Sequence, residues 1–164
     1  MAPSDEVDRI VGAWNAQRPD LDFSPLEVLS RMDRLSRHLD RARRDVFRRS
    51  DLETWEWDVL SALRRAGTPF RLSPKQLLQQ TLVSSGTMTN RIDRLVSRGF
   101  VRREADPDDG RSILVILTDD GRMRVDAAIT RLVDVEADLL QALSRADRER
   151  MAALLRKLSL SFDS

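Results

Sequence analysis

Residues 82–99 read LVSSGTMTNRIDRLVSRG, and this segment decides the fold. Its apolar residues recur at the spacing of one helix face, at Met88, Ile92, Leu95 and Val96. The other face carries short polar side chains and an arginine, namely Ser85, Thr87, Thr89, Asn90 and Arg94. Hydroxyl, amide and guanidinium groups of this kind bind base edges and phosphates. The segment therefore predicts a recognition helix that packs inward on one face and meets the major groove of DNA with the other.

A shorter helix is expected directly upstream of the recognition helix. Ser73-Pro74-Lys75-Gln76 combines an N-cap serine, a proline at the first helical position and a glutamine that closes a capping box. Ser84 or Ser85 can cap the longer helix, and Gly99 stands where a left-handed residue ends it. Two helices joined in this way have helix-turn-helix spacing.

A β-hairpin is expected downstream. Residues 101–104 and 112–117 favour strands, and the turn between them, residues 105–111, reads ADPDDGR. A hairpin after a helix-turn-helix makes a winged helix, with Arg111 at the wing tip, where it suits a narrow minor groove. We expect Asp109 to orient Arg111, and Arg98 is a weaker candidate for a phosphate contact.

The remaining chain predicts helices over residues 4–18, 24–49, 52–66, 118–142 and from 144 onward, so the fold is mostly α with a small β-hairpin wing. We divide the chain into N-terminal helices for dimerisation and a ligand pocket (residues 1–50), a winged helix-turn-helix DNA-binding domain (51–118) and C-terminal dimerisation helices (119–164). The terminal helices carry more apolar surface than a winged helix can cover, which predicts a homodimer. Its two-fold axis would place the recognition helices about one DNA turn apart on a pseudo-palindromic operator.

Composition excludes several classes of protein. The 164 residues include no cysteine and one histidine, His38, so disulfides, thiolate metal sites and a thiol switch are excluded, and no metal or other cofactor is expected. The formal net charge of +1 excludes a uniformly basic nucleic-acid coat. No apolar run approaches the roughly 20 residues of a membrane helix, and no signal peptide is present, so we expect a cytoplasmic protein with no membrane contact. Without a phosphate loop or a nucleophile beside a base, the chain predicts no enzyme.

Several motifs resemble the MarR family of bacterial transcriptional regulators. Asp109-Gly110-Arg111, followed after five residues by Leu117-Thr118-Asp119-Asp120-Gly121, is similar to the wing signature of that family. Residues 87–95, TMTNRIDRL, are similar to its recognition helix. The resemblance covers the chain from about Ser24 onward and implies a DNA-binding repressor.

A narrower resemblance is to the urate-responsive branch of this family, whose members have an extra N-terminal helix. Trp14, Asp58, Arg91 and Arg103 match the Trp, Asp, Arg, Arg set of that branch. The resemblance implies a pocket in which a small anion, urate or another purine, releases the protein from DNA. An indole can stack on a planar purine, and guanidinium groups can bind its anionic edge.

The same residues also permit other functions. Asp58, Arg91 and Arg103 could form a structural salt bridge between helices and wing, in which case the chain is an effector-independent DNA-binding factor. Other organic anions, including carboxylates of central metabolism and aromatic acids, suit the same charges. A winged helix can also serve protein contacts alone.

Overall fold

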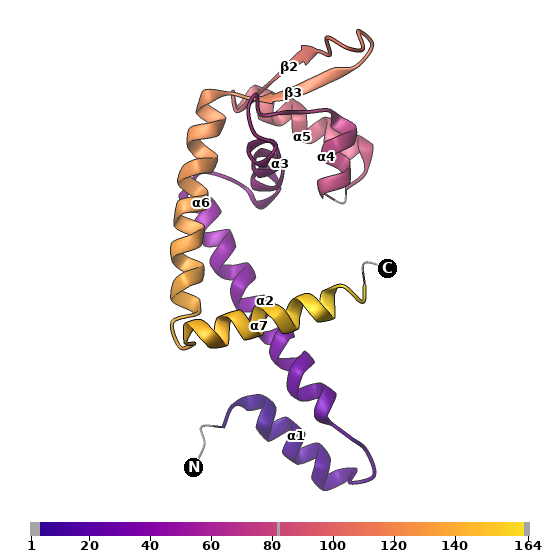
Figure 1. Ribbon diagram of the computed structural model, residues 1–164, viewed down its shortest axis with the longest axis vertical. Helices are drawn as coiled ribbons and strands as arrows, with labels where there is room; N and C mark the ends of the chain where they lie inside the picture. Colours follow the sequence, from indigo (N-terminus) through magenta and orange to yellow (C-terminus); the bar gives the residue numbers. More distant parts are fainter. Residues whose placement is uncertain (1–3, 82, 163–164) are drawn as a thin grey trace. The chain divides into compact units, whose positions relative to one another are not determined.

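The computed structural model describes residues 4–81 and 83–162, so Leu82 of the segment quoted above lies outside it. The elements follow in the order α1 (Glu6–Gln17), α2 (Ser24–Arg49), α3 (Thr54–Arg65), β1 (Arg71–Leu72), α4 (Pro74–Thr81), α5 (Ser85–Ser97), β2 (Val101–Ala105), β3 (Ile113–Leu117), α6 (Asp119–Leu139) and α7 (Arg145–Ser159) (Figure 1). The mostly helical fold with a small wing is confirmed. The chain divides into two compact units, one up to Arg43 and one from Arg44 onward.

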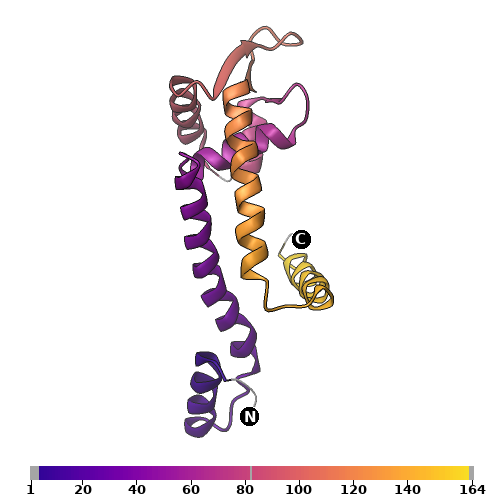
Figure 2. The ribbon, with the colours of Figure 1, turned by 90° about the vertical axis from the view of Figure 1, so that its left-hand side faces the viewer.

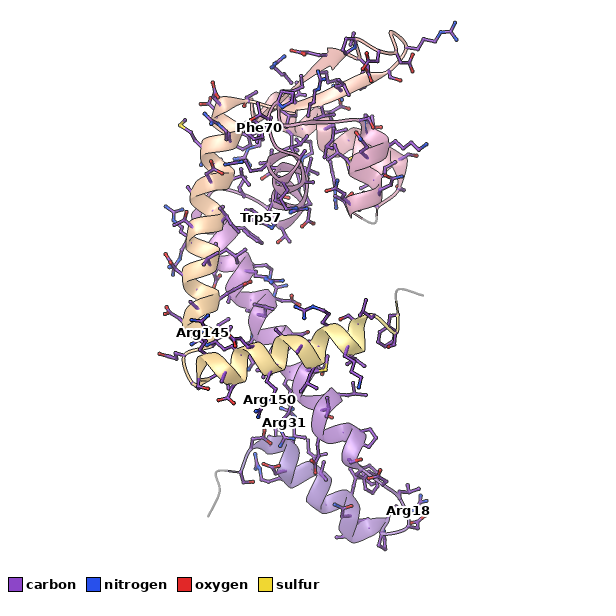
Figure 3. The ribbon with its side chains drawn as sticks, viewed as in Figure 1. Arg18, Arg31, Trp57, Phe70, Arg145 and Arg150 are labelled. Atoms are coloured by element: carbon purple, nitrogen blue, oxygen red, sulfur yellow. The ribbon has the colours of Figure 1, made fainter. Side chains whose placement is uncertain are left out.

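The first unit contains α1 and most of α2. Asp5 and Asp8 form a capping box at the start of α1, and Val7 and Val11 are its buried residues. Arg31 of α2 pairs with Asp5 at 2.8 Å and with Asp8 at 2.6 Å (Figure 3). The hydrogen bonds from Arg31 and the Asp8 backbone lower the pKa of Asp5 to about 2. This start of α1 is therefore held to α2 by charge as well as by apolar contact.

α2 begins at Ser24, the predicted first residue of the helix. The Ser24 backbone N–H donates to Asp22 Oδ1 at 2.9 Å. A carboxylate two residues upstream satisfies this N–H before the helical bonds begin. The helix itself ends at Arg49, as predicted.

The core lies in the second unit and joins α3, α4, α5, α6 and the sheet. Fully buried residues include Leu60 and Leu63 of α3, Leu77 of α4, and Met88 and Leu95 of α5. Val96 was expected on the same inward face, but it is 37% exposed because it lies at the edge of the apolar stripe. Three buried residues on α5, Met88, Ile92 and Leu95, suffice to fix which face of α5 points outward.

The helix-turn-helix forms as its capping residues predict. Ser73 N donates to Gln76 Oε1 at 2.8 Å, and Gln76 N donates to Ser73 Oγ at 3.2 Å, which completes the capping box of α4. Ser84 is the N-cap of α5 and accepts from Thr87 N at 3.3 Å. Gly99 has a φ of 73°, the left-handed conformation that glycine adopts most easily.

The sheet has one more strand than the predicted hairpin. Its three antiparallel strands lie in the order β1-β3-β2, with Arg103 opposite Val115 and Arg71 opposite Ile116. The hairpin of β2 and β3 projects beyond α5 in Figure 1. β1 was not predicted, because a strand of two residues shows no alternation of apolar and polar side chains and forms only by pairing with β3.

Two helices complete the chain. Thr118 caps α6 by accepting from Gly121 N at 3.1 Å, and Ser144 caps α7 by accepting from Asp147 N at 3.2 Å. Figure 2 shows α6 running away from the sheet and α7 turning across its far end. α6 ends at Leu139, earlier than the predicted residue 142. Within the described chain, α7 contributes no residue to the core.

Candidate nucleic-acid interface and effector site

The outward face of α5 presents the polar groups that the sequence predicted. Ser85, Thr87, Thr89 and Asn90 are all exposed. The Thr89 hydroxyl donates to the Ser85 carbonyl at 3.1 Å, and the Ser84 hydroxyl donates to Thr87 Oγ1 at 2.9 Å. Within residues 4–81 and 83–162, the side-chain amide of Asn90 makes no hydrogen bond. Its donors and acceptor are thus available to a base edge, as an amide that reads adenine requires.

The wing turn is organised by Asp109. Its Oδ1 accepts from the Arg111 backbone N–H at 3.1 Å, and its Oδ2 accepts from the Ser112 hydroxyl at 2.7 Å. These bonds lower the pKa of the Asp109 carboxyl, the Ser112 contact having the larger effect. Asp109 therefore fixes the backbone at Arg111, while the Arg111 side chain stays exposed at the tip.

Arg94 lies over an aromatic ring of α3. Its guanidinium is 4.6 Å from the centroid of the Trp55 ring, and its Nη2 is 3.2 Å from Glu53 Oε1. Arg94 is still half exposed, with 54% of its side chain accessible. An exposed pair of this kind is weak in water, so a DNA phosphate can compete with Glu53 for the same guanidinium.

Arg98 is engaged inside the protein. Its Nη1 is 2.6 Å from Glu56 Oε2, its Nη2 is 2.7 Å from Asp51 Oδ2, and its guanidinium stacks over Phe100 at 4.6 Å. Glu56 is only 1% exposed, so Arg98 compensates a buried carboxylate. The predicted phosphate contact of Arg98 gains no support from this arrangement.

Asp58 and Arg91, predicted as ligand-binding residues, are brought into electrostatic range of each other. Partial desolvation raises the pKa of the Asp58 carboxyl, although the positive charges of Arg91 and then Arg65 act in the opposite direction. Arg91 lies 5.7 Å from the Trp55 ring centroid, and its Nη1 is buried without a hydrogen-bond partner in the described chain. A buried, unpartnered guanidinium N–H is costly, and an anionic ligand would supply the missing acceptor.

The other two predicted ligand residues contact side chains outside this pair. Arg103 of β2 has its Nη2 2.5 Å from Asp93 Oδ1 of α5, which ties the wing to the recognition helix. Trp14 belongs to the first unit, where it is 49% exposed and stacks on Phe23 with ring centroids 5.8 Å apart. The structure thus unites Asp58 with Arg91, and gives Arg103 and Trp14 partners of their own.

Five residues that complete these contacts were not predicted from the sequence. They are Asp51, Glu53, Trp55 and Glu56, in and just before α3, and Asp93 of α5. Trp55 fits the apolar face of its helix, and Asp93 lies within the family motif of residues 87–95. Arg91 and Arg94 are three residues apart on one helix face, which was a signal for a shared partner, but nothing in the spacing indicates α3 as its source.

The described part of the chain shows neither a metal site nor a membrane-spanning helix. It contains no cluster of three or more histidine, cysteine, aspartate or glutamate side chains that could hold a metal ion. None of its helices is long and apolar enough to cross a membrane.

Comparisons with known proteins agree with the geometry. The MarR family model matches residues 50–112. The transcriptional regulator PecS of Dickeya dadantii (strain 3937) is 37% identical over 150 residues, covering 92% of this chain and 90% of PecS. A cysteine-to-serine variant of Escherichia coli MarR in complex with operator DNA has a TM-score of 0.67 at 26% identity, covering 94% of this chain and 99% of that one.

A third relative is BpsR of Bordetella bronchiseptica, whose DNA binding is regulated by 6-hydroxynicotinic acid. Its structure has a TM-score of 0.62 at 28% identity and covers 85% of this chain and 96% of BpsR. The similarity to PecS extends over nearly the full length of both proteins. The family match covers the helix-turn-helix, the first strand of the wing and the turn that follows it. The chain belongs to the MarR family of winged helix-turn-helix transcriptional regulators.

Proposed function

We propose that the protein is a homodimeric repressor that binds a pseudo-palindromic operator and is released from it by a small planar organic anion. The observation that carries the effector is the buried, unpartnered Nη1 of Arg91 on the recognition helix itself. A ligand that bonds to this atom contacts the element that reads DNA.

The DNA-binding part rests on α5 and the wing. The exposed hydroxyls of Ser85, Thr87 and Thr89, the Asn90 amide and the Arg94 guanidinium meet the major groove, while Arg111 enters the minor groove. The E. coli MarR relative was solved with its operator, which supports the same mode of binding here.

The effector part rests on the cluster of Asp58, Arg91 and Trp55. Arg91 binds the anionic edge of the ligand, Asp58 accepts a ring N–H, and the Trp55 indole offers an aromatic surface. Urate or another purine has these groups, and Trp14 and Arg103 complete the set implied by the family resemblance. The effector of BpsR is also a planar nitrogen heterocycle with an acidic group, which supports this class of ligand.

Release follows from linkage between the two sites. A ligand that draws Arg91 toward Asp58 and Trp55 favours one orientation of α5, and DNA favours the orientation that fits its groove. Each ligand then weakens the other by the same factor.

The test is a DNA-binding titration on the intergenic region upstream of the gene, with and without millimolar urate, xanthine and a panel of aromatic acids. We expect a purine to release the wild type, and we expect Arg91→Gln and Asp58→Ala to bind DNA without responding to it. Arg150→Gln, which removes an arginine from α7, is the matched control and should respond as the wild type does. Release by an aromatic acid alone would replace the purine by that class. Tight binding that no compound relieves would remove the effector and leave a DNA-binding protein.

The DNA contacts are tested separately by two substitutions. Arg111→Ala is expected to weaken binding to all sequences and to lower the salt dependence by about one unit of slope, because one cation leaves the interface. Asn90→Ala is expected to relax preference at one base position by roughly 1–3 kcal/mol. Equal losses on every DNA sequence for both variants would count against the assignment.

A further inference from the structure

A cavity of about 590 Å³ lies between the end of α2, Phe100 and the first half of α6. Four arginines line it, Arg49, Arg98, Arg124 and Arg131, with Asp120 as the carboxylate in its wall. Asp58 and Arg91 do not belong to this wall, so the cavity is separate from the proposed effector site. A concave site with several convergent guanidinium groups is the usual form of an anion-binding pocket.

The fold holds two of these guanidinium groups in place. Arg131 Nη1 donates to the Arg49 carbonyl and to Ser50 Oγ, both at 3.1 Å, and Arg124 Nη1 donates to the Ser50 carbonyl at 3.3 Å. Ser50 is only 3% exposed, so these anchoring bonds are partly shielded from water. These hydrogen bonds satisfy carbonyls at the end of α2. They use one nitrogen of each guanidinium, although a guanidinium carries five N–H donors. The remaining donors are pre-positioned for a ligand.

The charges around the cavity do not balance. Glu56 and Asp51 compensate Arg98, and Asp51 also lies 3.4 Å from Arg124. Across the described ranges, neither Arg49 nor Arg131 forms an ion pair. The anchoring partners of Arg131 are neutral oxygens, which leave its charge uncompensated. Asp120 offsets only part of this positive surplus. Like charges gathered in one concave site repel each other, and a bound anion would remove that repulsion.

We propose that this cavity binds a small organic dianion whose phosphate or carboxylate groups contact Arg49, Arg124 and Arg131. The planar guanidinium fork matches both of these groups. Phe100 and the exposed Met123 side chain add an apolar wall for the carbon skeleton of the ligand. Arg98 and Arg124 stack over the Phe100 ring at 4.6 and 5.2 Å. Asp120 accepts a hydrogen bond from a ligand hydroxyl.

The experiment is calorimetric titration of the full chain with glucose 6-phosphate, glycerol 3-phosphate and succinate at low salt. We expect saturable binding of one molecule per chain that weakens as salt is added. We also expect the same compound to raise the thermal unfolding midpoint, since it binds only the folded chain. Binding by the two phosphates alone assigns the site to phosphate compounds, and binding by succinate alone assigns it to dicarboxylates.

Three variants locate the binding. Arg49→Gln and Arg131→Gln are expected to weaken it at least tenfold, and Met123→Trp is expected to block it by filling the cavity while leaving every arginine in place. The Arg49 side chain forms no ion pair that the fold depends on, so its variant is expected to fold even if Arg131→Gln does not. Arg150→Gln and Asp58→Asn are the controls and should bind as the wild type does, which separates this site from the proposed effector site. Lack of saturable binding to the wild type by all three compounds, or unchanged affinity in the three cavity variants, would overturn the proposal.

Discussion

Asp58 ionises less readily in the folded chain than in water, because its surroundings remove part of the hydration of the carboxylate. The folded-state pKa therefore lies above the unfolded one, and ionisation of Asp58 opposes folding once the pH exceeds both values. Below the unfolded pKa the carboxyl is neutral in both states and this penalty disappears. A residue that costs stability at neutral pH is typical of a binding site.

We expect Asp58→Asn to raise the thermal unfolding midpoint at pH 7, because the amide carries no charge to desolvate. The gain should shrink as the pH is lowered toward the raised pKa of Asp58. Scanning calorimetry of wild type and variant between pH 7 and pH 4 measures this difference. A lower midpoint for Asp58→Asn at pH 7 would show that the attraction to Arg91 and Arg65 outweighs the desolvation.

Arg98 is expected to stabilise the fold, whereas Asp58 is expected to destabilise it. Its removal leaves the Glu56 carboxylate buried at 1% exposure without its partner, so we expect Arg98→Ala to lower the free energy of unfolding by about 3 kcal/mol. Urea unfolding measures this loss. Arg145→Ala is the matched control: its pair with Glu149 lies at the surface (Figure 3), and its effect should stay within about 1 kcal/mol. An unchanged stability of Arg98→Ala, with a reduced salt dependence of DNA binding, would restore Arg98 as a phosphate contact.

The residue types of the site were predictable, but their pairings were only partly so. Asp58 and Arg91 were predicted as ligand residues from the family resemblance, and the structure places them within electrostatic range of each other. The partners of Arg98 and Arg103 were not predicted. Arg98 meets Glu56, 42 residues away in the sequence, through a contact between helices that no local spacing encodes. Asp93 and Arg103 are ten residues apart, but they meet only because Gly99 reverses the chain between α5 and β2.

Whole elements were more predictable than pairings, because helix ends are local. The capping box of Ser73 and Gln76 and the caps Ser84, Thr118 and Ser144 all form as the sequence indicates. Each depends on side chains within three residues of the backbone groups that they satisfy. β1 was not predictable, because its two residues become a strand only through pairing with β3.

Gly121 shows why the first turn of α6 needs a glycine. A Cβ at this position would lie 2.9 Å from Leu117 Cδ1 and would overlap the Phe100 carbonyl oxygen, which also accepts from Thr118 N. We expect Gly121→Ala to destabilise the fold by roughly 1–3 kcal/mol, because backbone on both sides of the contact must move. Chemical unfolding measures the loss. Gly86→Ala is the control, since a Cβ there meets no atom within 4 Å. Equal stability of the two variants would contradict the close packing of α6 on Phe100.

At the scale of the whole molecule, the apolar residues of α7 call for a partner. Leu154 is 62% exposed, Leu155 41% and Leu158 37%, and Phe162 in the turn after the helix is 79% exposed. None of them reaches the core. A stripe of this kind on a helix at the end of the chain is typical of an oligomer interface. The sequence predicted a homodimer from the apolar surface of the terminal helices, and we propose that a second copy of the chain covers this stripe.

We expect the double substitution Leu154→Glu and Leu158→Glu to shift the protein from dimer to monomer, because it places carboxylates in the proposed apolar interface. Light scattering after size-exclusion chromatography measures the mass. DNA affinity should fall with it, since two recognition helices no longer act on one operator. Lys157→Glu, which changes a charge on the same helix outside the apolar stripe, should leave the mass unchanged. A double variant that stays dimeric would place the interface elsewhere.

The position of the Trp55 ring has a practical consequence. Arg91 and Arg94 both lie over this indole, one from the proposed effector site and one from the proposed DNA face. Indole fluorescence responds to nearby charge, so displacement of either guanidinium should change the emission of Trp55 without any added dye. Trp57 stacks on Phe47, and replacing both Trp57 and Trp14 by phenylalanine would leave Trp55 as the single tryptophan of the sequence. The protein would then report optically, from one side chain, on both of the events that it is proposed to couple.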